Sequence, residues 1–128
     1  MIIADCHCGA VRLEADVPPT MVTECNCSIC RRYGARWAYY TRAQARVVTP
    51  PEASSFYIWG DRCIEFHRCN VCGCITHYEG AQDKSETSRL AINARMMDPK
   101  DIAGVSVRKF DGADSWTTIE IIPPPDPL

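Results

Sequence analysis

The sequence has no long hydrophobic run. Although 46% of its 128 residues are hydrophobic, no apolar stretch approaches the roughly 20 residues that a membrane-spanning helix needs. The first residues, Met1 to Asp5, also lack the basic and apolar regions of a secretory signal peptide. We therefore expect one soluble domain over residues 1–122 and a Pro-rich tail over 123–128. The expected location is the cytoplasm, a reducing compartment where disulfides rarely persist.

An excess of positive charge is also absent. The chain carries 14 Lys and Arg against 16 Asp and Glu, which gives a formal net charge of -2. This balance argues against the broad basic surface of a typical nucleic-acid-binding protein. We expect neither a membrane nor a nucleic acid as partner, and the sequence does not determine the oligomeric state.

Helical periodicity is scarce, and short alternating or aromatic-rich stretches separated by turn residues take its place. This pattern predicts a mainly β fold. One helical turn is expected over 29–33, with Ser28 as its cap and Gly34 at its end. A second is expected near 96–98, where it ends before Pro99 or restarts at it. The expected strands cover 11–17, 36–41, 45–48, 55–59, 63–68, 75–78, 88–93, 105–108 and 116–121.

Cysteine, by contrast, is abundant and clustered. Spacings of one or two residues bring thiolates within reach of one metal ion, and an odd number of cysteines fits a disulfide framework badly. Buried apolar thiols are the other explanation, but they do not account for paired clusters that contain glycine or serine. We therefore interpret the clusters as metal ligands. Seven of the nine cysteines lie in three motifs: Cys6-His7-Cys8-Gly9, Cys25-Asn26-Cys27-Ser28-Ile29-Cys30 and Cys69-Asn70-Val71-Cys72-Gly73.

The three motifs divide into a set of four and a set of three. The first and last motifs each end in a glycine that permits a tight turn with backbone N–H groups directed at sulfur, so together they predict a closed structural zinc site. The middle motif predicts a catalytic zinc with an open fourth position, which would favour a substrate sulfur. Two zinc ions per chain are expected. The structural ligands would be Cys6, Cys8, Cys69 and Cys72, and the ligands of the open site Cys25, Cys27 and Cys30.

The residues leave several alternatives open. The middle motif could gain a fourth protein ligand and become a second structural site, and Cys74 could replace Cys72 in the first. Arg31 and Arg32 are either solvated charges or groups that hold an anionic substrate. The aromatic residues of 37–40 and 56–59 are expected in the core, and Cys63 is expected to be a packed thiol. The candidate fourth ligands are Cys63, Cys74, His7, His67 and His77.

At these motifs the sequence resembles the family of glutathione-dependent formaldehyde-activating enzymes, which includes centromere protein V. The match covers the three cysteine motifs in order, Arg31-Arg32 after the middle one, residues 92–99, Phe110-Asp111-Gly112 and Ser115-Trp116. The resemblance implies a β-tent fold of small antiparallel sheets around zinc. It also implies the same two zinc sites. Cys74 departs from the family pattern, where a small hydroxyl or similar residue is expected.

The resemblance further implies an activity. The family's named enzyme adds the thiol of glutathione to formaldehyde and forms S-hydroxymethylglutathione. We therefore expect a zinc-dependent carbon–sulfur lyase or synthase that takes a small thiol and a small aldehyde, with Cys25, Cys27 and Cys30 as its catalytic residues. The alternative is a non-enzymatic zinc-binding module for a protein or another macromolecule, since the family includes a chromosome-associated member.

Overall fold

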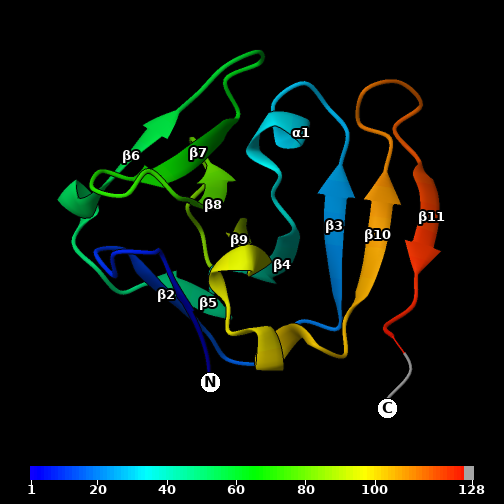
Figure 1. Ribbon diagram of the computed structural model, residues 1–128. Coiled ribbons are helices and arrows are strands. Elements are labelled where there is room, and N and C mark those ends of the chain that lie inside the picture. Colours follow the sequence, from blue (N-terminus) through cyan, green and yellow to red (C-terminus); the bar gives the residue numbers. More distant parts are fainter. Residues whose placement is uncertain (126–128) are drawn as a thin grey trace.

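The computed structural model describes residues 1–125, so residues 126–128 of the expected Pro-rich tail lie outside the described residues. Short strands dominate the chain, which confirms the predicted mainly β fold (Figure 1). The elements are β1 (Ile2–Asp5), β2 (Arg12–Ala15), β3 (Met21–Cys25), α1 (Cys30–Tyr33), β4 (Trp37–Thr41), β5 (Ala45–Val47), η1 (Pro51–Ala53), β6 (Ser54–Tyr57), β7 (Ile64–Cys69), β8 (Ile75–Gly80), β9 (Arg89–Asn93), η2 (Ala94–Met96), η3 (Pro99–Ile102), β10 (Ser106–Phe110) and β11 (Thr118–Ile122), where η marks a 3-10 turn.

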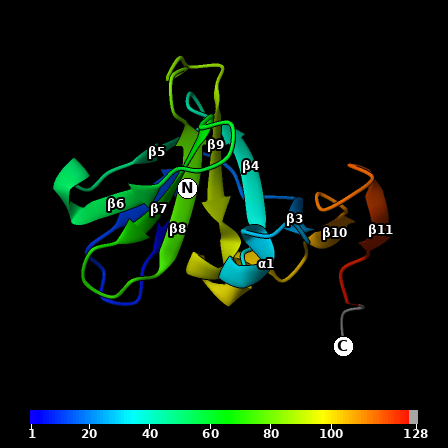
Figure 2. The ribbon, with the colours of Figure 1, turned by 90° about the horizontal axis from the view of Figure 1, so that it is seen from above.

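The described strands form two sheets. Eight strands follow one another in the order β11-β10-β3-β4-β9-β8-β7-β6, and three form a small sheet in the order β1-β2-β5. Every neighbouring pair is antiparallel except β10 and β3, which are parallel. Seen from above, the ends of the large sheet, β6 and β11, lie on opposite sides of the molecule (Figure 2).

The two faces of the large sheet bury different side chains. On one face, Ala38 and Ile92 pack with Leu13 of the small sheet in the main hydrophobic core. On the other face, Trp37 and Ala91 belong to a second, aromatic cluster. Because successive residues of a strand point to opposite faces, β4 and β9 each contribute to both clusters. The main core holds the two sheets together, and the aromatic face is left for a pocket.

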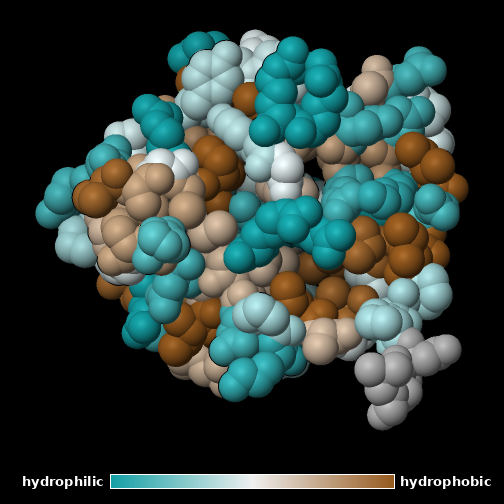
Figure 3. Space-filling view, in the orientation of Figure 1, coloured by the Kyte–Doolittle hydropathy of each residue, from teal (hydrophilic) through white to brown (hydrophobic). Residues whose placement is uncertain are grey.

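The edge strand β11 lies outside both clusters. Its five residues are all exposed, and it pairs with β10 alone. Ile119, Ile121 and Ile122 are 60%, 54% and 41% exposed. Hydrophobic surface is visible at the right of Figure 3, on the side where β11 lies in Figure 1. Substitutions in β11 are therefore expected to affect the core little.

The structure departs from the sequence prediction at two strands and one helix cap. Alternation predicts neither β1 nor β3; the central strand β3 is buried on both faces, with Val22 and Thr23 each 1% exposed. Ser28 is not the cap of α1, because Ile29 occupies that position without a side-chain hydrogen bond. Gly34 does end the helix, at a φ of 63° that glycine adopts without strain.

The other helical segments are single turns. The second turn expected from sequence is two turns, η2 and η3, and the latter begins at Pro99. The Asp98 side chain caps η3 by accepting a hydrogen bond from the backbone N–H of Lys100. Across residues 1–125, no helix has the length and apolar character needed to cross a bilayer.

Ile92→Ala should show how much the main core contributes to the stability of the fold. Ile92 is fully buried in β9, and we expect its truncation to lower the free energy of unfolding by about 2–5 kcal/mol, through lost burial and a residual cavity. Ile121→Ala makes the same chemical change on the exposed strand β11 and should change the free energy of unfolding by about 0.5 kcal/mol or less. Urea titration measures both; equal losses would contradict the assignment of Ile92 to the core.

Candidate functional site

The turns after β1 and before β8 face each other and bring four cysteine sulfurs together. Cys6 and Cys8 come from the first turn, Cys69 ends β7, and Cys72 lies in the second turn. All four sulfurs lie within 4.8 Å of one another. The Cys8 Sγ is 3.7 Å from the Cys6 Sγ and 3.6 Å from the Cys69 Sγ. Sulfurs at the corners of a tetrahedron around zinc, with Zn–S bonds of about 2.3 Å, lie about 3.8 Å apart. The group therefore has the spacing of a tetrahedral thiolate site.

Backbone donors stabilise the thiolate form of Cys69 and Cys72, two of these four cysteines. The N–H groups of Val71 and Cys72 point at the Cys69 Sγ, with N···S distances of 3.3 and 3.5 Å. The Cys72 and Val71 donations hold the pKa of the Cys69 thiol below its ordinary value. Donation from the N–H of Cys74 contributes most to lowering the pKa of Cys72, to about 5. Gly73, with a φ of 77°, permits the turn that directs these groups.

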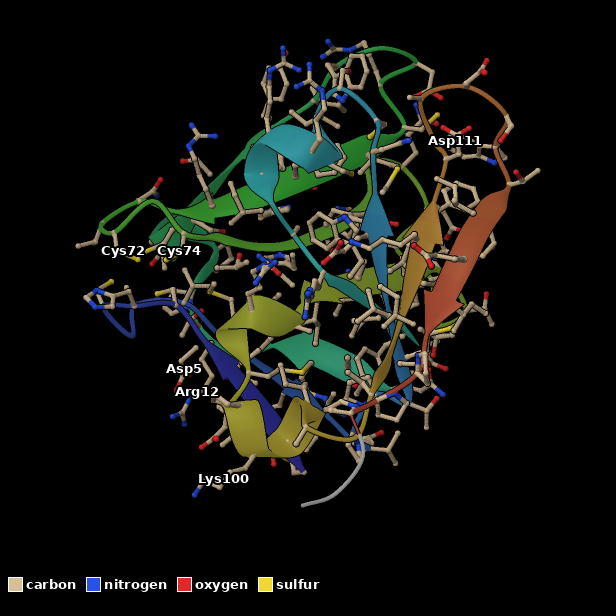
Figure 4. The ribbon with its side chains drawn as sticks, turned by 45° about the vertical axis from the view of Figure 1, so that its right-hand side comes forward. Asp5, Arg12, Cys72, Cys74, Lys100 and Asp111 are labelled. Atoms are coloured by element: carbon tan, nitrogen blue, oxygen red, sulfur yellow. The ribbon has the colours of Figure 1, made fainter. Side chains whose placement is uncertain are left out.

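Cys74 lies beside the four-cysteine group and close to Cys72 (Figure 4). It is partly buried and packs against the main core. The four sulfurs that gather include that of Cys72 and not that of Cys74. Within residues 1–125, none of the candidate fourth ligands considered for the middle motif joins Cys25, Cys27 and Cys30.

The middle motif forms a separate group of three sulfurs, also within 4.8 Å of one another. β3 ends at Cys25, and α1 begins at Cys30. The N–H of Cys30 donates to the Cys27 Sγ (3.4 Å), and the Trp37 Nε1–H donates to the Cys30 Sγ (3.4 Å). Burial raises the pKa of the Cys25 and Cys30 thiols, whereas the Cys30 N–H lowers that of Cys27 against its burial. The three sulfurs are close enough to bind one metal ion, which would hold them in the thiolate form.

The loop between β10 and β11 closes over this group. The Asn26 Nδ2 donates to the Asp111 Oδ1, and the Ala113 N–H donates to the Asn26 Oδ1, both at 3.0 Å. The Asn26 amide also lowers the pKa of Asp111, which Figure 4 labels in this loop. A Cβ at Gly112 would lie 2.4 Å from the Cys25 Sγ, so the loop packs against sulfur where only a glycine fits.

A cavity of about 540 Å³ opens on the aromatic face of the large sheet, and the three cysteines line it. Its floor consists of the side chains that β4, β7 and β8 direct to this face, among them Tyr39, Phe66 and Tyr78. Trp59 from the β6–β7 loop and Trp116 from the β10–β11 loop also line it. A metal ion at the cysteine group would therefore face an aromatic pocket.

Several expectations about individual residues are wrong. Cys63 is exposed rather than packed. Phe56, Tyr57 and Trp59 are 49%, 49% and 42% exposed and thus are not core residues, because β6 is an edge strand and Trp59 follows it in a loop. Trp37 is buried, as expected, and also lines the pocket.

The arginines that follow the middle motif do not line this pocket. Arg32 Nη1 donates to the carbonyl of Ser28 at 2.7 Å, and Arg31 lines a second hollow behind the cysteines. The pocket's arginines are Arg89 and Arg108. The sequence around these two arginines gives no sign that they line the pocket, because only strand pairing brings them there.

A third polar group lies on β7 and β8. The stacked rings of His67 and His77 have centroids 4.3 Å apart, and Glu79 completes a set that could also hold a metal. Here a cation of the chain is already in place: the Lys84 Nζ lies 2.8 Å from a Glu65 oxygen and 2.9 Å from a Glu79 oxygen. Burial lowers the pKa of His77 to about 3, so this histidine is neutral near pH 7. The carboxylates of this group thus already have a positively charged partner in Lys84.

Gly112→Ala should disturb the closure of the loop over Cys25. Because the new Cβ would meet the Cys25 Sγ at 2.4 Å, the loop or the sulfur has to move, and we expect a loss of about 1–3 kcal/mol in unfolding free energy. Gly104→Ala is the control, since its Cβ would meet no atom within 4 Å. Urea titrations followed by tryptophan fluorescence measure both; an unaffected Gly112→Ala protein would contradict the close packing.

Comparison with known proteins agrees with this geometry. The family model described as "Glutathione-dependent formaldehyde-activating enzyme" matches residues 1–110. The crystal structure of a Rhodobacter sphaeroides protein, a structural genomics target, is similar with a TM-score of 0.66 and 30% sequence identity. That match covers 80% of this chain and 96% of the Rhodobacter sphaeroides chain. The chain therefore belongs to the family of glutathione-dependent formaldehyde-activating enzymes.

Proposed function

We propose that the chain binds two zinc ions with different tasks. The four-cysteine group would hold a structural zinc, which the sulfur spacing of 3.6–3.7 Å and the backbone donors support. The three-cysteine group would hold a zinc with an exchangeable fourth ligand. Its all-sulfur donor set suits zinc, and His, Cys, Asp and Glu of residues 1–125 supply no fourth protein ligand.

We further propose that the three-cysteine site joins a thiol to formaldehyde or another small aldehyde, as a carbon–sulfur lyase or synthase. The observation that carries this proposal is a three-sulfur group that opens directly onto the 540 Å³ cavity. Catalytic zinc sites have three protein ligands and one position for water or substrate, whereas structural sites are closed. Membership of the family supplies the reaction class.

In the proposed reaction the sulfur of the thiol forms a bond to the carbonyl carbon, and the thiol proton ends on the carbonyl oxygen. A zinc ion at Cys25, Cys27 and Cys30 would bind the thiol sulfur and lower its pKa. The chain's own residues would position the reacting groups. The Trp37 indole N–H orients the Cys30 sulfur, and the aromatic walls would hold the substituent of the thiol. The reverse reaction would release the aldehyde.

Cys27→Ser and Cys69→Ser should distinguish the role of the proposed structural zinc from that of the proposed open zinc site. We expect about two zinc ions per wild-type chain. Cys27→Ser should lose one zinc and keep a urea midpoint near that of the wild type. Cys69→Ser should fail to fold stably, because a structural zinc contributes its binding energy to folding. Metal analysis by mass spectrometry and urea titration measure these properties; unfolding of Cys27→Ser would make the middle motif structural.

The activity is testable by NMR exchange spectroscopy of glutathione and formaldehyde. We expect the zinc-loaded protein to increase the rate at which free glutathione and its hydroxymethyl adduct exchange. The Cys27→Ser protein should leave the rate at the uncatalysed value, because it lacks one ligand of the open site. If the wild type also leaves the rate unchanged, glutathione is not its thiol.

A further inference from the structure

Arg108 of β10 is a cation in the wall of the pocket beside the three-cysteine group. In the part of the chain that the structure describes, no Asp or Glu oxygen lies within 4.0 Å of its guanidinium group. Asp61 is the one carboxylate among the described lining residues, and its Oδ1 accepts a hydrogen bond from the backbone N–H of Cys63 at 3.1 Å. The charge of Arg108 is therefore available to a molecule bound in the pocket.

Two neighbours hold the Arg108 side chain in place. Its Nε donates to the Thr23 Oγ1 at 3.1 Å, and Thr23 is a buried residue of β3 that is 1% exposed. The guanidinium carbon lies 5.0 Å from the centroid of the Phe110 ring. A guanidinium has five N–H donors in a fixed plane, and the contact with Thr23 uses the one on Nε. The terminal N–H groups of Arg108 are thus positioned but keep their donor capacity.

The guanidinium of Arg108 lies on the cysteine side of its own backbone. Phe110 is the next residue of β10 that faces the pocket, and it pairs with Cys25 of β3. Because the guanidinium carbon lies near the Phe110 ring, the side chain extends along the strand toward Cys25. Two residues of strand span about 7 Å, a distance that an arginine side chain can cover. The charge therefore lies toward the cysteine end of the pocket.

The pairing of Arg108 with its other neighbours leads to the same group of sulfurs. Arg108 pairs with Thr23, and Thr23 pairs with Trp37 of β4. The Trp37 indole N–H donates to the Cys30 Sγ at 3.4 Å. The row of the sheet that contains Arg108 therefore also contains the residue that contacts Cys30.

Arg89, the other arginine of the pocket, lies further from the cysteines. It pairs with Thr41, which lies about 13 Å of strand beyond Trp37. Its guanidinium carbon lies 4.2 Å from the centroid of the Tyr39 ring, and its Nη1 donates to the Tyr78 Oη at 3.5 Å. Arg89 is thus a matched comparison for Arg108, because it is also an arginine over an aromatic ring in the same pocket.

Addition of a thiol to an aldehyde moves negative charge onto an oxygen atom. The S–H bond breaks, the S–C bond forms, and the π electron pair of the C=O bond moves to the oxygen, which then takes up the proton. This oxygen is two bonds away from the sulfur, so a group that stabilises it has to lie near the site that binds the sulfur. Fixed N–H donors directed at such an oxygen stabilise the transition state.

We propose that Arg108 is a catalytic residue that donates hydrogen bonds to the aldehyde oxygen as negative charge develops on it. The proposal rests on the proposed thiol–aldehyde chemistry at Cys25, Cys27 and Cys30. Because a guanidinium is not deprotonated in proteins, Arg108 stabilises the charged oxygen and does not protonate it. The proton that the thiol releases reaches the oxygen through water. The same contact serves the reverse reaction.

Two small thiols test this contact without any reaction. Mercaptoacetate and 2-mercaptoethanol both have an oxygen three bonds from sulfur, but only that of mercaptoacetate is charged. In calorimetry on the zinc-loaded protein, we expect mercaptoacetate to bind at least about tenfold more tightly. Arg108→Met should reduce this ratio at least about fivefold, and Arg108→Lys, which keeps the charge, should reduce it less. Arg89→Met and Arg31→Met should each change it less than about twofold.

NMR exchange of glutathione and formaldehyde tests the catalytic step. Arg108→Met should lower kcat by about 100-fold and leave the zinc content and the urea midpoint near those of the wild type. Arg31→Met should keep the wild-type kcat, because Arg31 lies near the cysteines but outside this pocket. A raised KM with an unchanged kcat in Arg108→Met would make Arg108 a residue for binding the thiol and would overturn the proposal.

The binding measurement also separates this proposal from the proposed function. A preference for mercaptoacetate that Arg108→Met leaves intact, or that Arg89→Met reduces equally, would overturn the role of Arg108. A preference that depends on Arg108, in a wild-type protein that does not accelerate the exchange, would support the position of the cation beside the sulfur and contradict the thiol–aldehyde reaction instead.

Discussion

The fold depends on the meeting of two turns through four sulfur atoms. Cys6 and Cys8 follow the first strand of the small sheet, whereas Cys69 ends β7 of the large sheet and Cys72 lies in the turn before β8. This group joins the sheets at one end of the core that they share. We propose that a zinc ion holds these four sulfurs, because four thiolates at these distances would otherwise repel one another. A domain of 128 residues has a modest core, and the proposed metal site would add to its stability.

The main core and the pocket lie on opposite faces of one sheet. Because strand residues alternate between faces, Ala38 and Ile92 lie in the main core, whereas Trp37 and Ala91, their neighbours in sequence, belong to the aromatic cluster on the pocket side. The three-cysteine group lies on the pocket side, where the β10–β11 loop is tied to it through Asn26. The sites proposed for structure and for reaction can therefore change independently.

The sequence predicted the features that depend on the spacing of residues close together in the chain. The grouping of Cys25 with Cys27 and Cys30 follows from their separation, as does the turn at Gly34. The pocket could not be predicted in this way, because strand register places Arg89 and Arg108 in one pocket with cysteines that are 59 or more residues away in sequence. Likewise, composition suggests that residues 56–59 are core, whereas their position on an edge strand exposes them. β3 also escaped prediction, because a strand buried on both faces does not alternate between polar and apolar residues.

The division between one closed and one open zinc site is the central claim, and anomalous diffraction at the zinc edge tests it most directly. The claim predicts two zinc peaks per chain. One should lie among the sulfurs of Cys6, Cys8, Cys69 and Cys72, and the other should have three sulfur ligands and a fourth ligand that does not come from the chain. A single peak, or a protein side chain as the fourth ligand of the second zinc, would contradict it.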